Sequence, residues 1–168
     1  MMLTFTALVA APTADAYTVY VSSEKDNTIT VVDGETLELL HTVDVGERPR
    51  GIALSKDNRS LYICTSDADH IEVLDLDTLK VTHTLPSGPD PELLVLDRDG
   101  RYIYAANEDD NMVTVIDVEK RSKVNEIQVG VEPEGMGLSP DGNWLVNTSE
   151  TTNMAHFINL KSMEVEHN

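Results

Sequence analysis

The sequence of 168 residues is poor in cysteine, in basic residues and in long apolar segments. It contains one cysteine, Cys64, so no disulfide can form within the chain, and cysteine usage indicates no cellular compartment. Its 12 Lys and Arg residues are opposed by 30 Asp and Glu residues, which gives a formal net charge of −18. Because nucleic acids and anionic membranes attract Lys and Arg, this imbalance argues against both as partners. The negative charge favours a soluble protein whose partners are cationic or carry metal ions. The alternative is that the acidic residues only keep the protein soluble.

A short apolar segment at the N-terminus, residues 3–11, is too short to span a bilayer. It is followed by Ala14, Asp15 and Ala16, a small-x-small pattern of the kind that signal peptidase cleaves. We therefore expect residues 1–16 to be an export signal and the protein to be periplasmic or secreted. No Lys or Arg precedes Lys25, so the basic region of a signal is missing. A start further upstream and a disordered N-terminal extension are the alternatives.

The rest of the chain repeats itself with a period of 42 residues. Copies of one 15-residue stretch start at Val19, Leu61, Ile103 and Leu145, and each contains a short alternating apolar segment. A glycine and a proline recur in the same register, at Gly46, Gly88 and Gly130 and at Pro49, Pro91 and Pro133. A period of about 40–50 residues with strand-like content is typical of β-propeller blades. The predicted fold is all-β, with blades of four antiparallel strands.

One repeat predicts strands at residues 51–55, 61–65, 70–74 and 80–85, a turn at 56–59 and a polar loop at 66–69. The predicted units are an incomplete blade at 17–47, blades at 48–89 and 90–131, and an incomplete blade at 132–168. The first unit lacks an innermost strand, so we expect about half of a ring and the N-terminal half of a longer chain. A genuine four-bladed protein and a ring of two copies are the alternatives. Open strand edges predict self-association.

Propeller geometry places the loop between the second and third strands of a blade on the same face as the segment that joins two blades. That face would collect a set of acidic residues, which we take as candidate binding residues. They are Glu24, Asp26, Asp67, Asp69, Asp90, Glu92, Glu108, Asp109, Asp110, Glu132, Glu134 and Glu150. Such a face is suited to a basic partner; Ca²⁺ binding is an alternative, but no EF-hand loop is present, and plain solvation is another.

Arg48 and Arg50 are the only paired cations expected on this face, whereas the corresponding positions of the following repeats are acidic. They form a candidate anion clamp, because a guanidinium group offers a rigid bidentate fork. The alternative is that they pair with carboxylates of neighbouring blades and stabilise the blade packing.

Catalytic and cofactor-binding patterns are missing. His41, His83 and His167 share a position in the outermost strand, and no inter-blade segment contains a histidine. Cys64 lies in the middle of a strand, and neither a G-x-S-x-G elbow nor a Gly-rich phosphate loop occurs. We expect no catalytic residue, no metal ligand and no cofactor.

The repeats resemble the YVTN-type β-propeller family in stretches such as NTITVVD at 27–33, NMVTVID at 111–117 and GMGLSPDG at 135–142. Phrases such as RPRG at 48–51 and NEDDN at 107–111 are similar to periplasmic propellers associated with PQQ-dependent alcohol catabolism. This resemblance implies a non-catalytic binding or scaffolding propeller that accompanies quinoprotein dehydrogenases, with a protein partner in a periplasmic oxidation system. The alternative is a propeller enzyme, hydrolase or oxidoreductase, or a cofactor-binding protein, whose metal or haem site lies in the other half.

Overall fold

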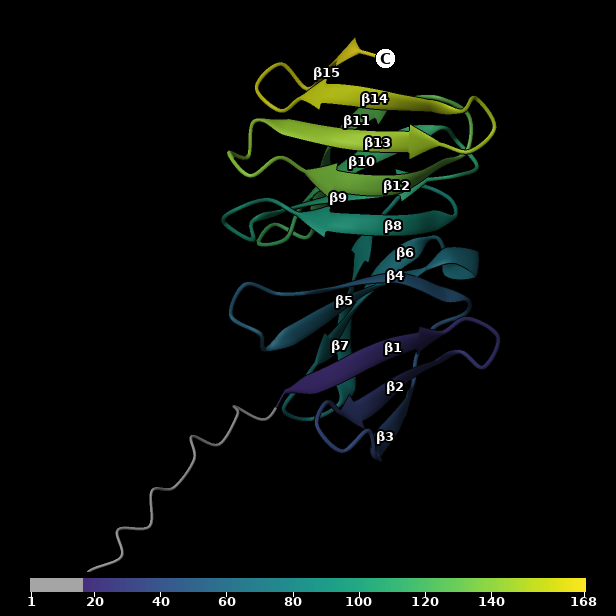
Figure 1. Ribbon diagram of the computed structural model, residues 1–168, viewed down its shortest axis with the longest axis vertical. Coiled ribbons are helices and arrows are strands. Elements are labelled where there is room, and N and C mark those ends of the chain that lie inside the picture. Colours follow the sequence, from purple (N-terminus) through teal and green to yellow (C-terminus); the bar gives the residue numbers. More distant parts are fainter. Residues whose placement is uncertain (1–16) are drawn as a thin grey trace, which may run out of the picture.

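The computed structural model describes residues 17–168, so the expected signal segment lies outside the described residues. These residues form four antiparallel sheets, which we number blades 1 to 4 (Figure 1). Blade 1 contains β1 (Thr18–Ser23), β2 (Thr28–Asp33) and β3 (Leu39–Asp44). Blade 2 contains β4 (Pro49–Leu54), β5 (Ser60–Thr65), β6 (His70–Asp75) and β7 (Lys80–Pro86). Blade 3 contains β8 (Pro91–Leu96), β9 (Tyr102–Asn107), β10 (Met112–Asp117) and β11 (Ser122–Gln128). Blade 4 contains β12 (Pro133–Leu138), β13 (Trp144–Ser149), β14 (Met154–Asn159) and β15 (Glu164–His167).

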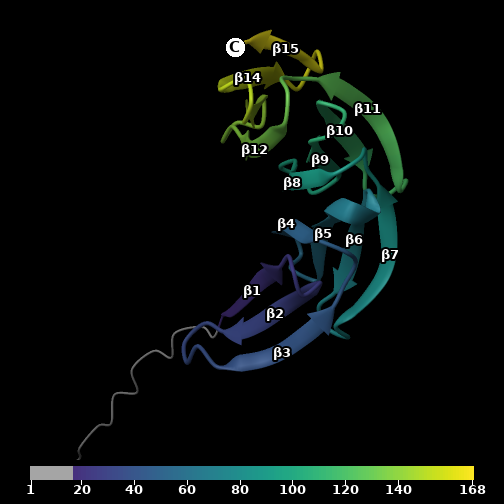
Figure 2. The ribbon, with the colours of Figure 1, turned by 90° about the vertical axis from the view of Figure 1, so that its right-hand side faces the viewer.

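The blades follow one another along an arc, with β4, β8 and β12 on its concave side and β3, β7 and β11 on its convex side (Figure 2). Within each blade the strands are paired in sequence order. The strands of blade 1 correspond in the repeat to the second, third and fourth strands of the other blades, so β1 forms the inner edge of that sheet. The chain is therefore a partial β-propeller, as the sequence predicts.

Apolar residues on alternating positions bind each blade to the next. Ile29 and Val31 of blade 1 pack against Leu61, Ile63 and Leu74 of blade 2, and all five are buried. Similar clusters join blade 2 to blade 3 and blade 3 to blade 4. Because strand side chains point alternately to the two faces, every interior blade is apolar on both faces. The hydrophobic core is thus a series of inter-blade layers.

In blades 2 and 4, an aspartate at one repeat position, Asp57 or Asp141, holds the turn between the first and second strands. Ser139 Oγ donates to Asp141 Oδ1 at 2.6 Å, and the Asn143 N–H donates to the same oxygen at 3.0 Å. These bonds lower the pKa of Asp141 to about 2. Gly142 follows with φ of +74°, a conformation that glycine adopts at little cost. The Asp-Gly pattern therefore marks the tight hairpins, as predicted. No helix within residues 17–168 is long and apolar enough to cross a membrane.

Candidate functional site at the inner edge of the blades

The loops after the second strands lie beside the segments that join the blades, in agreement with propeller geometry. The hydrogen bonds that hold them run from Ser66 N–H to the Arg48 carbonyl (3.1 Å), from Glu108 N–H to the Asp90 carbonyl (3.0 Å) and from Glu150 N–H to the Glu132 carbonyl (2.9 Å). The expected loop at 66–69 contains a short 3₁₀ helix, Ser66–Ala68, in which the Ser66 hydroxyl donates to the Pro91 carbonyl at 2.6 Å. The acidic loops therefore form one continuous rim.

Some of the polar residues of this rim maintain the loops themselves. The backbone N–H of Arg48 donates to Asn27 Oδ1 at 2.9 Å, and that of Asp90 donates to Asp69 Oδ1 at 3.1 Å. All four residues have positive φ, a conformation that Asn and Asp tolerate better than most residues. Asp69 thus has a structural role in addition to its place among the predicted binding residues.

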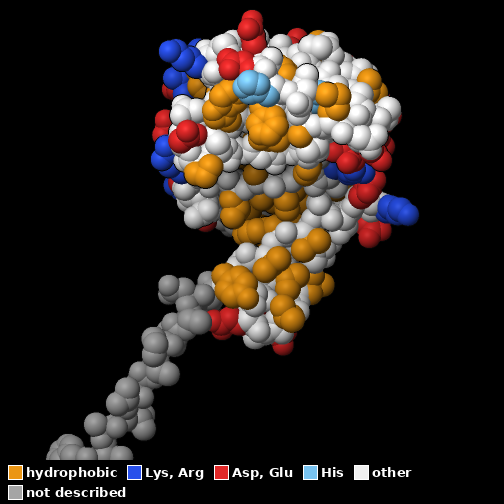
Figure 3. All heavy atoms as spheres, turned by 45° about the horizontal axis from the view of Figure 1, so that its top comes forward, with side chains coloured by type: hydrophobic (Ala, Val, Ile, Leu, Met, Phe, Trp, Pro, Cys, Tyr) orange, Lys and Arg blue, Asp and Glu red, His pale blue; other side chains and the backbone are white. Residues whose placement is uncertain are grey.

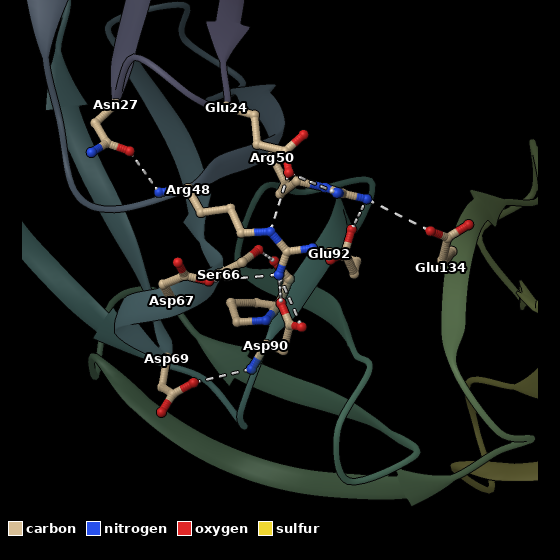
Figure 4. Close-up of polar contacts among 11 residues, drawn as sticks. Glu24, Asn27, Arg48, Arg50, Ser66, Asp67, Asp69, Asp90, Glu92 and Glu134 are labelled. Carbon is tan, nitrogen blue, oxygen red and sulfur yellow. Dashed lines mark hydrogen bonds and ion pairs between the residues drawn. The ribbon is translucent and has the colours of Figure 1, made fainter.

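Arg48 lies at the centre of a group of carboxylates from three blades (Figure 4). Its guanidinium contacts Glu24 of blade 1 at 3.2 Å, and on the blade 3 side it contacts Asp90 at 3.0 Å and Glu92 at 3.3 Å. Asp67 of blade 2 lies 3.6 Å away. Burial opposes the charged form, but hydrogen bonds to Glu24 and Asp90 outweigh it, and the pKa of Arg48 is raised.

Arg50 extends this network toward blade 4. It forms an ion pair with Glu92, lies 3.4 Å from Glu24 and lies 3.6 Å from Glu134. The sequence places Arg50, Glu92 and Glu134 in inter-blade loops; this is wrong in detail, because they are the second residues of β4, β8 and β12. Proline begins each of these strands, where its missing N–H is tolerated. The inner strands therefore carry the charged groups directly on the concave side.

Glu92 is the most unusual member of the group because it is only 1% exposed. Its burial raises its pKa to about 8, against the opposing charge of Arg50. Its carboxylate oxygen also lies within 4.8 Å of oxygens from Asp90 and Glu108. These three carboxylates are the described residues best placed to hold a cation, although Asp90 and Glu92 already contact Arg48.

A pocket of about 440 Å³ opens at the inner edge of the blades beside Arg50 and Glu92. Its lining consists of Ser22, Glu24, Pro49, Arg50, Gly51, Glu92, Leu93, Glu134, Gly135 and Thr148. No histidine, cysteine or methionine is among these lining residues, and His41, His83 and His167 lie on the outer strands as predicted. Ser22, Gly51, Gly135 and Thr148 were not predicted as site residues; Ser22 shares a repeat position with Thr148, and Gly51 shares one with Gly135.

The structure brings together only part of the predicted binding set. Glu24, Asp67, Asp90, Glu92 and Glu134 contact the two arginines. Three further predicted residues make no ion pair among residues 17–168 and lie on exposed loop tips; they are Asp26, Asp109 and Glu150. Two others have local contacts: Glu132 accepts a hydrogen bond from Thr151, and Asp110 accepts one from the Met112 N–H. The ion pairs fit the blade-packing alternative for Arg48 and Arg50, and anion binding by them stays a prediction.

Two family models match parts of this sequence. The family model of the cytochrome D1 heme domain matches residues 63–151, more than half of the chain. The chain belongs to the cytochrome D1 heme domain family. A second family model, for lactonases with a 7-bladed β-propeller, matches residues 10–91. No curated protein matches the sequence.

Solved structures support the same fold. The chain is similar to hydrazine synthase from Kuenenia stuttgartiensis, with a TM-score of 0.84 and 27% identity. The match covers 90% of this chain and 45% of that one, so the chain spans less than half of the matched protein. Because 1137 chains of solved structures match and one fold can carry many functions, the fold alone does not indicate what this protein does.

The family name implies a bound haem, so we compared the residues that line the pocket with those that a haem requires. Haem iron requires an axial ligand such as histidine, methionine, cysteine or tyrosine, and the residues lining the described pocket include none of these. The two carboxylates of a haem would also meet those of Glu24, Glu92 and Glu134 around Arg50, the one cation among the lining residues. Residues 17–168 therefore do not fit a haem at this pocket.

The two family names nevertheless bear on the functional alternatives. They describe a haem domain and a lactonase, so they favour a propeller enzyme or cofactor-binding protein over a non-catalytic module. The association with PQQ-dependent oxidation stays a prediction.

Proposed function

We propose that the chain supplies one side of the axial pocket of an exported propeller hydrolase, in which Glu92 transfers protons and Arg50 orients a small polar substrate. The observation that carries this proposal is a carboxyl group that is 1% exposed and yet lines an open pocket beside a guanidinium group. Burial raises the pKa of Glu92 to about 8, close to the range in which a group both accepts and donates protons efficiently. Strongly perturbed carboxyl groups in a cleft are typical of functional sites.

The charge of the pocket narrows the substrate class. Glu24 and Glu134 flank Arg50, so an anionic substrate would meet two further carboxylates beside the cation. An uncharged cyclic ester is better suited, because its carbonyl oxygen requires only a hydrogen-bond donor. The similarity of residues 10–91 to lactonases supports the same class.

The proposed reaction is lactone hydrolysis. The carboxylate of Glu92 accepts a proton from water as the water oxygen attacks the carbonyl carbon, and Arg50 stabilises the negative charge on the carbonyl oxygen. The bond between the carbonyl carbon and the ring oxygen then breaks. The proton held by Glu92 passes to the departing ring oxygen, which yields a hydroxy acid and restores the carboxylate.

The test measures hydrolysis of uncharged γ- and δ-lactones by the 168-residue protein. We expect kcat/KM to rise with pH around a midpoint near 8, and Glu92→Gln to lower it by about 100-fold or more. Asp99→Asn is the matched control, since Asp99 lies in an exposed hairpin turn on the opposite face. A protein that is folded by circular dichroism and hydrolyses none of these lactones would contradict the proposal.

A second candidate function rests on the acidic rim. Glu108, Asp109 and Asp110 lie together in one loop of this rim, which fits a basic partner in a periplasmic oxidation system. We expect a basic c-type cytochrome to bind at low salt and to dissociate as salt rises, because exposed charges are screened beyond about 10 Å at 0.1 M ionic strength. Binding that survives high salt, or survives neutralisation of these three residues, would argue against this function.

A further inference from the structure

The two end blades of the arc each present an exposed apolar face. On blade 1, Val19 and Val21 of β1 are 37% and 47% exposed. On blade 4, Phe157 of β14 is 40% exposed and stands beside Trp144 and Val146 of β13. Figure 3 shows apolar side chains gathered on the C-terminal part of the molecule and a second apolar stripe over the first blade. No described strand packs on either face.

The blade 1 face corresponds to a surface that is buried in every other blade. In the 42-residue register, Val19, Val21 and Val32 occupy the positions of Leu61, Ile63 and Leu74 in blade 2. Those three residues are fully buried against blade 1. The side of blade 1 that carries Val19 and Val21 is therefore the side that packs on a preceding blade.

The blade 4 face corresponds to the opposite half of the same interface. Val146 and Phe157 occupy the positions of Tyr104 and Val115 in blade 3, which are buried against Leu145 and Ile158 of blade 4. On blade 4 these positions instead line a cavity of about 260 Å³ between Ser139, Trp144, Val146, Phe157 and His167. This is the side on which a following blade packs.

We infer that the two end faces bind each other, so that residues 17–168 associate head to tail with a second copy of the chain. The two faces are complementary, because each reproduces one half of the interfaces that join blades 1 to 4. A head-to-tail interface generates a closed ring when its rotation closes. Two arcs of four sheets would give a ring of eight, within the range of known propellers of about four to eight blades.

The net charge of the chain determines how this association depends on salt concentration. Val19, Val21, Val146 and Phe157 are apolar, so burying them is favourable at any salt concentration. The two copies, however, each have a net charge of −18 and repel each other at low salt. Added salt therefore strengthens the association, which is the opposite of the dependence expected for docking at the acidic rim. The inference is independent of the proposed hydrolase function.

The primary experiment is sedimentation equilibrium of the 168-residue protein across a concentration series. We expect twice the mass of one chain, with association that is tighter at about 0.5 M than at about 0.05 M salt. Trp144 is the only tryptophan, so its fluorescence emission should shift to shorter wavelength on association. A protein that stays monomeric at every concentration and salt level would overturn the inference, and the two end faces would then be free to bind a different partner.

Variants distinguish the head-to-tail arrangement from other contacts. Val19→Glu and Phe157→Glu should each weaken association by at least about tenfold, because each places a charge in an apolar interface. Val124→Glu is the matched control, since Val124 is 46% exposed on the outer strand β11, away from both end faces.

Mixing the two variants supplies the decisive result. In a head-to-tail pair of Val19→Glu and Phe157→Glu chains, one interface contains both new charges and the other contains none. The mixture should therefore recover a dimer through the intact interface at a protein concentration at which each variant alone is monomeric. A mixture that stays monomeric while the unmodified protein dimerises would show that the two end faces do not bind each other, and would overturn the inference.

Discussion

The guanidinium group of Arg50 and the carboxyl group of Glu92 form an ion pair between β4 and β8, the innermost strands of neighbouring blades. The two residues occupy the same repeat position, as does Glu134 in blade 4. One position of the repeat therefore supplies both the cation and its partners across successive blades. Blade packing and the chemistry of the pocket depend on the same contact.

Replacing Arg50 by methionine should destabilise the protein. The change keeps much of the apolar stem but, above about pH 8, where Glu92 is ionised, it leaves this carboxylate buried with one cation fewer, and an unpaired buried charge is costly. Because Arg50 is partly exposed and Arg48 still contacts Glu92, we expect a loss of about 2 kcal/mol in the free energy of unfolding rather than the full effect of an isolated pair. Urea denaturation followed by circular dichroism measures it.

Arg59→Met is the matched control for that variant. Arg59 pairs with Asp77 at 3.4 Å, but both side chains are about 70% exposed. Exposed pairs contribute about 0–1 kcal/mol, so this variant should remain close to the unmodified protein. Equal losses in the two variants would show that burial of the Arg50–Glu92 pair has no special effect.

The stability of the protein should depend on the protonation of Glu92. The folded protein holds this proton up to about pH 8, whereas the unfolded chain loses it near the ordinary glutamate pKa of 4.5. Between these values the folded state binds more protons, so the free energy of unfolding falls as pH rises, by up to about 1.4 kcal/mol per pH unit. Glu92→Gln should remove this contribution. Denaturation at several pH values measures both slopes, and parallel slopes would contradict the raised pKa.

The repeat made most of the fold predictable from the sequence. The alternation of Ile71 with Val73 predicted the strand that the structure places at His70–Asp75, because every blade must bury both faces. The 3₁₀ helix at Ser66–Ala68 was not predicted, since it depends on the bond from Ser66 to the Pro91 carbonyl, a contact between blades. Local patterns carry no signal for such contacts.

The site was less predictable than the fold for the same reason. The sequence selected Arg48, Arg50 and the acidic residues, but it treated Glu92 as one of many exposed loop residues. Its burial follows from the close approach of β4 and β8 on the concave side, where Gly51 lies against Glu92 and Leu93. The curvature of the arc, which no short pattern encodes, decides which carboxylates reach the arginines.

Cys64 should be unreactive in the folded protein. It is fully buried, and burial raises the pKa of its thiol well above the ordinary range, whereas the thiolate is the reactive form. We expect labelling by a thiol reagent such as DTNB only when urea unfolds the chain, in parallel with the circular dichroism signal. Rapid stoichiometric labelling in native buffer would contradict the burial of this residue.

Gly51 should tolerate no side chain, because β4 approaches the backbone of β8 at this point. A Cβ atom on Gly51 would lie 2.7 Å from the Glu92 carbonyl oxygen and 2.7 Å from Leu93 Cα. These are backbone atoms that cannot rotate aside, so Gly51→Ala must push the two inner strands apart. Overpacking of this kind costs about 1–3 kcal/mol, and we expect a loss in that range in the free energy of unfolding.

Gly137 provides the matched control for this prediction, since it also lies on an inner strand, β12, but a Cβ atom there would meet nothing within 4 Å. Gly137→Ala should leave stability unchanged or raise it slightly, because alanine loses less backbone entropy on folding. Urea denaturation of both variants compares them directly. If both alanine variants are as stable as the unmodified protein, then β4 and β8 do not approach each other as closely as the structure shows.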